Sequence, residues 1–263
     1  MPNHFHVQKI EKIYSSDEGC TRPAQVILDN GNRAILKYPH NQQGIIVLVN
    51  EYVSYELATA IELSVPNFGT AVVDDQTILC DVGNVNLLGV GFYSQYIANV
   101  VPISSRTVKR ASNLDERCRL ILLDAIVKNS DRHTSNVLIG FEKSDLKLYS
   151  IDFSHAFGDP DWDCNSLVLG DFASPYIWRE NVDLYQLLLQ APPMILFEQL
   201  VREKEHIQAC ITDALLDKIF DEIPGEWRQE VGMGHLDHLK KYIQSKIVHL
   251  DEICATIHNE GGI

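Results

Sequence analysis

The feature that most constrains this fold is a polar loop, residues 128–135, between one helix pattern and two short strand patterns. Residues 114–127 carry apolar side chains at a spacing that suits a buried helix. Residues 136–141 and 146–151 are short and apolar, and we expect them to form two strands that face each other. Asp152 follows the second strand, so the Asp152 carboxylate should face the same cavity as Asn136 at the start of the first strand.

The first third of the chain predicts strands and turns with one helix. Residues 25–28 and 33–38 flank an Asn-Gly pair, which is a strong hairpin signal, so Lys37 should lie near the end of the second strand. Residues 50–63 have the period of an amphipathic helix, for which Asn50 could be the N-cap. Residues 77–79 and 89–103 favour further strands. Past Asp183 the pattern is mostly helical, with breaks at 192–193, 223–225 and 232–234.

These patterns predict an α+β fold with two lobes. The chain has 263 residues, of which 45% are hydrophobic and 22% charged, the balance of an ordinary globular protein. We expect a strand-rich N-lobe over residues 1–100 and a helical C-lobe over residues 101–263. The connection near residues 93–105 would lie between the lobes, where ligands commonly bind in a cleft.

Charge and composition argue against several classes of protein. The net charge of −14 lowers the expectation of direct nucleic-acid binding, which usually needs basic patches. The six cysteines are scattered without a CxxC pair, so neither a zinc site nor a disulfide framework is indicated, and free thiols in a reducing cytoplasm are expected. Residues 1–13 lack the apolar segment of a signal peptide, and we expect no membrane span.

The charged and amide residues, taken in order, predict a site for phosphoryl transfer from ATP. Asn136 and Asp152 could supply oxygen ligands to Mg²⁺, and Asp131 could accept or orient the proton of an attacking hydroxyl. Lys37 would reach phosphate oxygens from the other lobe, held by a Glu on the neighbouring helix, Glu51 first and Glu56 second. Each residue alone has an ordinary structural explanation, since Asp and Asn are common in loops and turns. Their order along the chain is what favours function.

The run Asp131-Arg132-His133-Thr134-Ser135-Asn136, followed by Ile151-Asp152-Phe153, resembles the HipA-like kinases. The Asp-Arg-His-x-x-Asn pattern is also similar to that of phosphatidylinositol 3- and 4-kinases. The resemblance covers roughly residues 19–163 and implies a protein-kinase-like fold that uses ATP and Mg²⁺. It implies that Asp131 is the catalytic Asp, that Asn136 and Asp152 bind Mg²⁺, and that Lys37 binds ATP phosphate. By the same resemblance, His133 should buttress its loop rather than act as the base.

Several members of that family are serine/threonine kinases that act as toxins, so the resemblance implies a protein substrate and a possible antitoxin or regulatory partner. The phosphate-covering loop should precede Lys37, where Gly19 and Thr21 would approach the cofactor. In this family such a loop can be autophosphorylated, which makes Ser15, Ser16 and Thr21 candidate sites. The chain departs from many kinases in having Asp-Phe-Ser instead of Asp-Phe-Gly, and it is shorter than typical full-length HipA toxins.

Three other interpretations stay open at this point. A lipid or small-molecule kinase would use the same site, although the acidic net charge argues against a lipid surface. A catalytically inactive pseudokinase would be a binding module, and the presence of all the expected catalytic residues argues against it. A toxin component held by an antitoxin would need a partner chain, which this sequence cannot identify.

Overall fold

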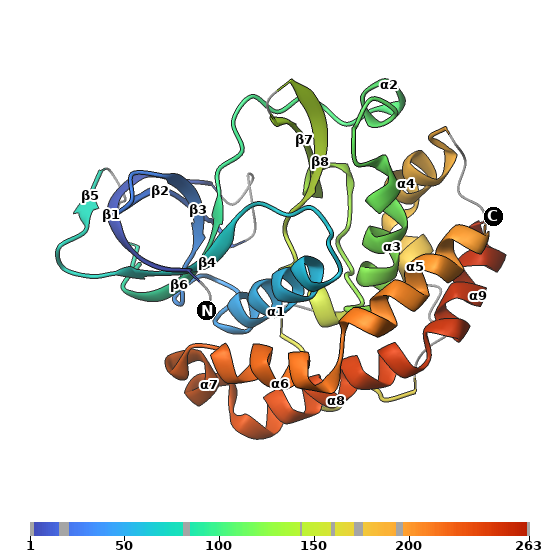
Figure 1. Ribbon diagram of the computed structural model, residues 1–263. Helices are drawn as coiled ribbons and strands as arrows, with labels where there is room; N and C mark the ends of the chain where they lie inside the picture. Colours follow the sequence, from blue (N-terminus) through green and yellow to red (C-terminus); the bar gives the residue numbers. More distant parts are fainter. Residues whose placement is uncertain are drawn as a thin grey trace.

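The computed structural model describes residues 3–15, 21–80, 85–142, 144–158, 161–170, 176–192 and 197–261. A strand-rich N-terminal part lies beside a helical C-terminal part, and one helix, α1, lies against both (Figure 1). This is the two-lobed α+β arrangement that the sequence predicts. Within the described ranges, no helix is long and apolar enough to cross a membrane.

The N-terminal strands form a curved sheet that closes on itself (Figure 1). Its strands pair in the order β2-β3-β6-β4-β1-β5, and β1 also pairs with β2, which completes a ring of five strands. The ring encloses a small apolar core of its own, which includes Val7, Ile10, Val26 and Leu36. The strands are β1 (Asn3–Ile13), β2 (Ala24–Leu28), β3 (Arg33–Lys37), β4 (Phe68–Val73), β5 (Ile78–Leu79) and β6 (Gly89–Gln95).

The predicted hairpin is confirmed. β2 and β3 pair antiparallel, and the turn between them places Gly31 at φ 81°, a conformation that glycine adopts without a Cβ penalty. Lys37 is the last residue of β3 and pairs with Phe92 on β6. The prediction for residues 89–103 was too long, because β6 ends at Gln95 and the chain then leaves the sheet. β1 and β4 were not predicted; β1 in particular is mostly polar, with Val7 and Ile10 as its buried apolar residues.

Helix α1 (Ile46–Ala60) begins four residues before the predicted start. Asn50 is therefore not an N-cap; it lies inside the helix, where its side chain is fully buried. The apolar period was a weak guide here because α1 is buried on most of its faces, against the sheet on one side and the C-terminal helices on the other (Figure 1).

The C-terminal part surrounds a second hairpin. β7 (Val137–Glu142) and β8 (Asp145–Ser150) pair antiparallel, with Val137 opposite Ser150, as predicted. Asn136 and Ile151 extend this pairing, since the Ile151 N–H donates to the Asn136 carbonyl over 3.0 Å. The hairpin thus brings the residues just before β7 beside those just after β8.

Helices pack around this hairpin and form the larger apolar core together with α1. The predicted helix at 114–127 is a 3-10 turn (Leu114–Glu116) that continues into α3 (Arg117–Ile126). The predicted helix breaks at 223–225 and 232–234 separate α6, α7 and α8. Helix α4 ends at Gln190, just ahead of the predicted break at 192–193, whose second residue lies outside the described residues. The other helices are α2 (Ser105–Val108), α4 (Tyr176–Gln190), α5 (Phe197–Cys210), α6 (Asp213–Glu222), α7 (Gly225–Val231), α8 (Met233–Val248) and α9 (Leu250–Gly261).

Candidate active site

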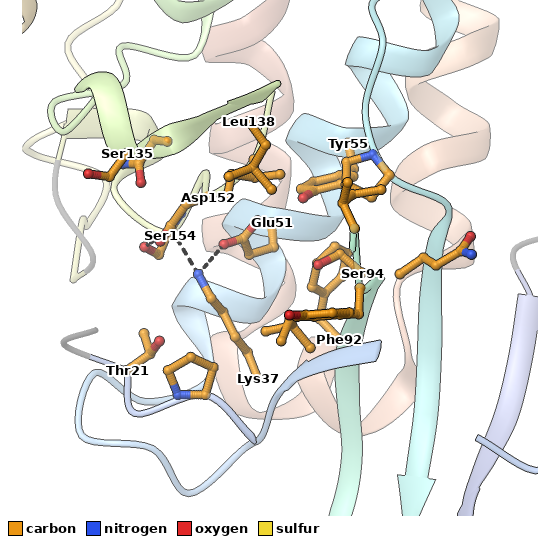
Figure 2. Close-up of a pocket in the computed structure, with 18 of the residues that line it drawn as sticks. Thr21, Lys37, Glu51, Tyr55, Phe92, Ser94, Ser135, Leu138, Asp152 and Ser154 are labelled. Atoms are coloured by element: carbon orange, nitrogen blue, oxygen red, sulfur yellow. Dashed lines mark hydrogen bonds and ion pairs between the residues drawn. The ribbon is translucent and has the colours of Figure 1, made fainter. Parts of the chain in front are cut away.

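A cleft of about 570 Å³ lies where the sheet, α1 and the β7–β8 hairpin meet. One wall comes from β3 and β6, and the opposite wall comes from the loop before β7 and the segment after β8 (Figure 2). Six of the predicted site residues line it: Thr21, Lys37, Glu51, Asp131, Asn136 and Asp152.

Lys37 lies at the centre of this cleft between two carboxylates. Its Nζ donates to Glu51 Oε1 and, over 2.8 Å, to Asp152 Oδ1 (Figure 2). The Lys37 and Glu51 side chains are 9% and 1% exposed. Burial opposes the charge on Lys37, but the two carboxylates hold its pKa above the ordinary value. One ammonium thus serves two anions, which leaves these three side chains with one excess negative charge when all are ionised.

The excess charge affects the two carboxylates differently. Burial raises the pKa of Glu51 to about 7, even though Lys37 opposes the shift. The Asp152 side chain is 37% exposed; its partial burial also favours the neutral form, but Lys37 and hydrogen bonds from Ser154 outweigh that effect and hold the Asp152 pKa below its ordinary value. Asp152 is therefore the anion that stays charged at neutral pH, which suits a metal ligand.

The backbone at Asp152 is held in an uncommon conformation. Its φ is +56°, in the left-handed region that few residues other than glycine adopt. Ser154 donates to Asp152 Oδ1 from its backbone N–H over 3.2 Å and from its hydroxyl over 2.6 Å. Glu51 Oε2 accepts the N–H of Phe153 over 3.1 Å. The serine of Asp-Phe-Ser thus orients the Asp152 carboxylate, a contact that glycine could not make with a side chain.

The loop of residues 129–136, hereafter the Asp131 loop, presents an acid and an amide to the cleft. Asn136 Nδ2 donates to the Asp131 carbonyl over 2.6 Å, so the amide oxygen is the end left for a ligand. His133 Nδ1 accepts the Ser135 N–H, and its Nε2 lies 3.7 Å from Asp131 Oδ1. This geometry suits the predicted buttressing role of His133. The Asp131 side chain is half exposed and accessible from the cleft.

Arg132 points away from the cleft and holds the Asp131 loop from behind. Its side chain is fully buried, and its Nε lies 3.0 Å from Asp124 Oδ2 on α3. One guanidinium nitrogen of Arg132 donates to the carbonyls of Asn136 and Ile151, the two residues that precede β7 and follow β8. Asp124 also accepts the Tyr185 hydroxyl over 2.9 Å and the Asn129 amide over 3.2 Å. Sequence reasoning missed Asp124 and Tyr185, which stand in helix patterns with no local signal.

The inner side of the cleft is apolar and aromatic. Tyr55 on α1 packs against Phe92 and Phe153, with ring centroids 5.0 and 5.4 Å apart. This cluster links the helix that carries Glu51 to the strand beside Lys37 and to the residue after Asp152. The apolar residues that line the cleft could enclose a flat ring; they include Ile35, Phe92, Leu138 and Ile151.

Two predicted positions fall outside this arrangement. The prediction of Glu56 as the second choice of partner for Lys37 was wrong. The charge of Glu56 interacts with those of Glu222 and Lys218 on α6, away from the cleft. Gly19, together with the candidate modification site Ser16, lies outside the described residues. Thr21 is buried at the edge of the cleft, on the same side as Lys37 (Figure 2).

The donor atoms of the cleft suit a small hard cation. Asp152 uses Oδ1 for Lys37 and Ser154, and Asn136 uses its amide nitrogen, so a carboxylate oxygen and an amide oxygen are available. Mg²⁺ and Mn²⁺ prefer such oxygen ligands and take the rest of their shell from water or phosphate. The residues present therefore fit a divalent cation.

Comparison with known proteins places this chain in a family. No curated protein sequence matches the chain significantly. The structure is similar to a proinflammatory kinase of Helicobacter pylori, CtkA, with a TM-score of 0.58 and 13% identity over 99% of this chain and 98% of that one. It is also similar to the Golgi casein kinase bound to Mn and ADP, with a TM-score of 0.50 and 13% identity over 95% and 74% of the two chains.

These likenesses show the fold, which is that of a two-lobed kinase. The family itself comes from the sequence, because the model for HipA-like kinases matches residues 9–253, nearly the whole chain. The chain belongs to the family of HipA-like kinases.

Proposed function

We propose that this kinase transfers the γ-phosphoryl group of ATP to a hydroxyl of Ser or Thr on a protein, with Mg²⁺ as the required cation. The observation that carries the proposal is the assembled Lys37 contact. Its Nζ bonds to Glu51 and lies 2.8 Å from Asp152, in the cleft that also holds Asp131 and Asn136. In kinases, phosphoryl transfer depends on such a Lys–Glu pair and metal-binding Asp being in place together.

The residues divide the work by position. Lys37 would bind phosphate oxygens inside the cleft, while Glu51 keeps its ammonium in place. Asp131 would accept or orient the proton of the attacking hydroxyl, and its half-exposed side chain leaves room for an acceptor to approach. The apolar wall around Phe92 and Leu138 would enclose the adenine ring.

Electrostatics support the requirement for a divalent cation. Among the described residues that line the cleft, three carboxylates, those of Glu51, Asp131 and Asp152, face one ammonium, that of Lys37. A triphosphate would meet net repulsion there unless added positive charge offsets it. Asn136 and Asp152 would hold the cation, which when bound neutralises phosphate charge and polarises the transferred group.

The test is a radiolabelled ATP assay with Mg²⁺, using the protein alone and the protein with cell lysate. The matched control is Asp131→Asn, which removes the proton acceptor with little change in shape. We expect label on a protein band with the wild type and none with the variant, and acid hydrolysis should release phosphoserine or phosphothreonine. Equal labelling by Asp131→Asn would reject the assigned base. Label that appears only in lipid or small molecules would reject the protein acceptor.

A further inference from the structure

Asn50 is a fully buried polar residue of α1 that stands next to Glu51 and that the catalytic roles above do not use. Its amide nitrogen donates to the Ser154 carbonyl over 2.8 Å and to the Ala156 carbonyl over 3.2 Å. Its amide oxygen accepts the Trp162 indole N–H over 2.7 Å. Both ends of the carboxamide are therefore engaged, and all three partners belong to the chain that follows Asp152.

The hydrogen bonds at Asn50 need both a donor and an acceptor in one short side chain. A carboxylate could accept from Trp162 but would face two carbonyl oxygens without a proton to donate. An apolar side chain would leave all three groups without their partner, and buried polar groups without partners are costly. The chemistry of this position thus specifies an amide rather than merely a residue of suitable size.

Glu51, the next residue along α1, bonds to the same stretch of chain. Its carboxylate accepts the Phe153 N–H and also holds Lys37. Two consecutive side chains of one helix therefore fix residues 153–158 and Trp162, hereafter the post-Asp152 segment. A displacement of this segment would carry Asp152 with it and would break the contact of Asp152 with Lys37.

The other side of the post-Asp152 segment is bonded to the chain that leads into the Asp131 loop. The Phe157 N–H donates to the Val127 carbonyl, and the Gly158 N–H donates to the Lys128 carbonyl over 2.9 Å. The Ser130 N–H donates to the His155 carbonyl over 3.2 Å. The segment is thus a bridge between α1, which carries Glu51, and the loop that carries Asp131.

We propose that Asn50 is a positioning residue that fixes the post-Asp152 segment to α1, so that the Lys37–Glu51 pair and the metal ligand Asp152 are assembled as one unit. The effect on catalysis rests on the proposed phosphoryl transfer, whereas the attachment of the segment does not. Many kinases order the corresponding segment by phosphorylation. Here uncharged hydrogen bonds from a buried amide hold its first part.

The test compares Asn50→Asp with a matched control, Asn113→Asp. Asn113 is also a buried Asn, and its amide donates to the Leu148 carbonyl over 3.0 Å while its oxygen accepts the Leu148 N–H over 2.8 Å. At each site the substitution replaces the donating amide nitrogen by an oxygen that can only accept. At Asn113 the hydrogen bond that is lost belongs to Leu148, in the middle of β8. The measurement is hydrogen–deuterium exchange by mass spectrometry on the full chain, with phosphoryl transfer measured alongside at several Mg²⁺ concentrations.

In Asn50→Asp we expect faster exchange in peptides that cover residues 153–158, and unchanged exchange rates in the C-terminal helices. We also expect phosphoryl transfer to fall on the order of tenfold or more, as for the loss of one to two hydrogen bonds, with a higher Mg²⁺ requirement. Asn113→Asp should speed exchange near Leu148 and leave residues 153–158 as in the wild type. Unchanged exchange at 153–158 in Asn50→Asp, or an increase spread evenly over the chain, would overturn the proposal.

Trp162→Phe provides a second variant should Asn50→Asp fail to fold. It removes the indole donor but keeps an aromatic ring beside Phe157, and it should also speed exchange at residues 153–158. Unchanged exchange there would overturn the proposal as well. If the wild type transfers no phosphate while Asn50→Asp loosens the segment, the positioning role stands and the proposed function alone fails.

Discussion

Replacing Arg132 by methionine should remove the structural support of the Asp131 loop while leaving the catalytic side chains of that loop unchanged. Methionine has a similar length but cannot donate, so the change removes the contact of Arg132 with Asp124 and its hydrogen bonds to the Asn136 and Ile151 carbonyls. Arg132 lies outside the residues that line the cleft, so direct contact with a substrate is not affected.

The size of the effect follows from burial. Both side chains of the Arg132–Asp124 pair are 0% exposed, so solvent does not screen the pair. Removing one partner of such a pair typically costs about 3–5 kcal/mol, because the remaining charge stays buried without compensation. Tyr185 and Asn129 still donate to Asp124, which places the expected loss near the lower end of this range. Total stabilities of folded domains are on the order of 5–15 kcal/mol, so the variant should remain folded at low temperature.

The assay is urea unfolding followed by fluorescence and circular dichroism for Arg132→Met, Asp124→Asn and the double variant. If the two single losses of stability were additive, the double variant would lose their sum. We expect it to lose about 2 kcal/mol less than that sum, because it has no buried charge left without a partner. Under conditions in which Arg132→Met is folded, its phosphoryl transfer should fall on the order of 100-fold, because the loop that Arg132 supports carries Asp131 and Asn136. A loss of stability below about 1 kcal/mol, or strict additivity in the double variant, would refute this reasoning.

Three further outcomes are expected. Asp131→Asn should lower the turnover number about 10²- to 10⁴-fold with unchanged urea unfolding and nucleotide affinity, and a fall in affinity alone would contradict the role of base. Folding raises the Glu51 pKa to about 7, so the folded chain binds this proton more tightly than the unfolded chain does. As the pH rises from 4.5 to 7, the wild type should therefore lose about 3 kcal/mol of unfolding free energy that Glu51→Gln does not lose. Parallel curves of stability against pH for the two proteins would contradict this expectation. Chelation of divalent cations should abolish protection of the fold by ATP in a thermal-shift assay, and protection that persists in chelator would contradict the electrostatic argument.

The parts of the site that the sequence predicts well are those set by local order. Asp131 and Asn136 are five residues apart, and the hairpin that follows returns the chain to Asp152, so two strand patterns were enough to bring these side chains together. The Asn-Gly turn likewise located Lys37 at the end of β3. In each case the relevant neighbours are joined by a short turn whose chemistry is visible in the residues.

The parts that could not be predicted depend on contacts between distant elements. Asn50 was interpreted as a helix cap because a short polar residue ahead of an apolar pattern is typical of one. Its partners are more than 100 residues away, and only the packing of α1 against the post-Asp152 segment reveals them. Strand β1 was missed for a related reason, since its register is set by pairing with β2 and β4 rather than by its own alternation.

The same distinction shows why the two buried networks matter for the chemistry. The Arg132 network connects α3 and α4 to the residues that precede β7 and follow β8. The Asn50 network connects α1 to the post-Asp152 segment. Asn136 accepts from Arg132, while Asp152 lies in the chain between Ile151, bonded to Arg132, and Ser154, bonded to Asn50, so both networks act on the proposed metal ligands. Because Arg132 and Asn50 are fully buried and bonded to the chain around these ligands, a cation that binds both ligands would find them already aligned. Loosening either network should therefore raise the Mg²⁺ concentration that phosphoryl transfer requires in a variant that is still folded, which the Arg132 and Asn50 variants can test.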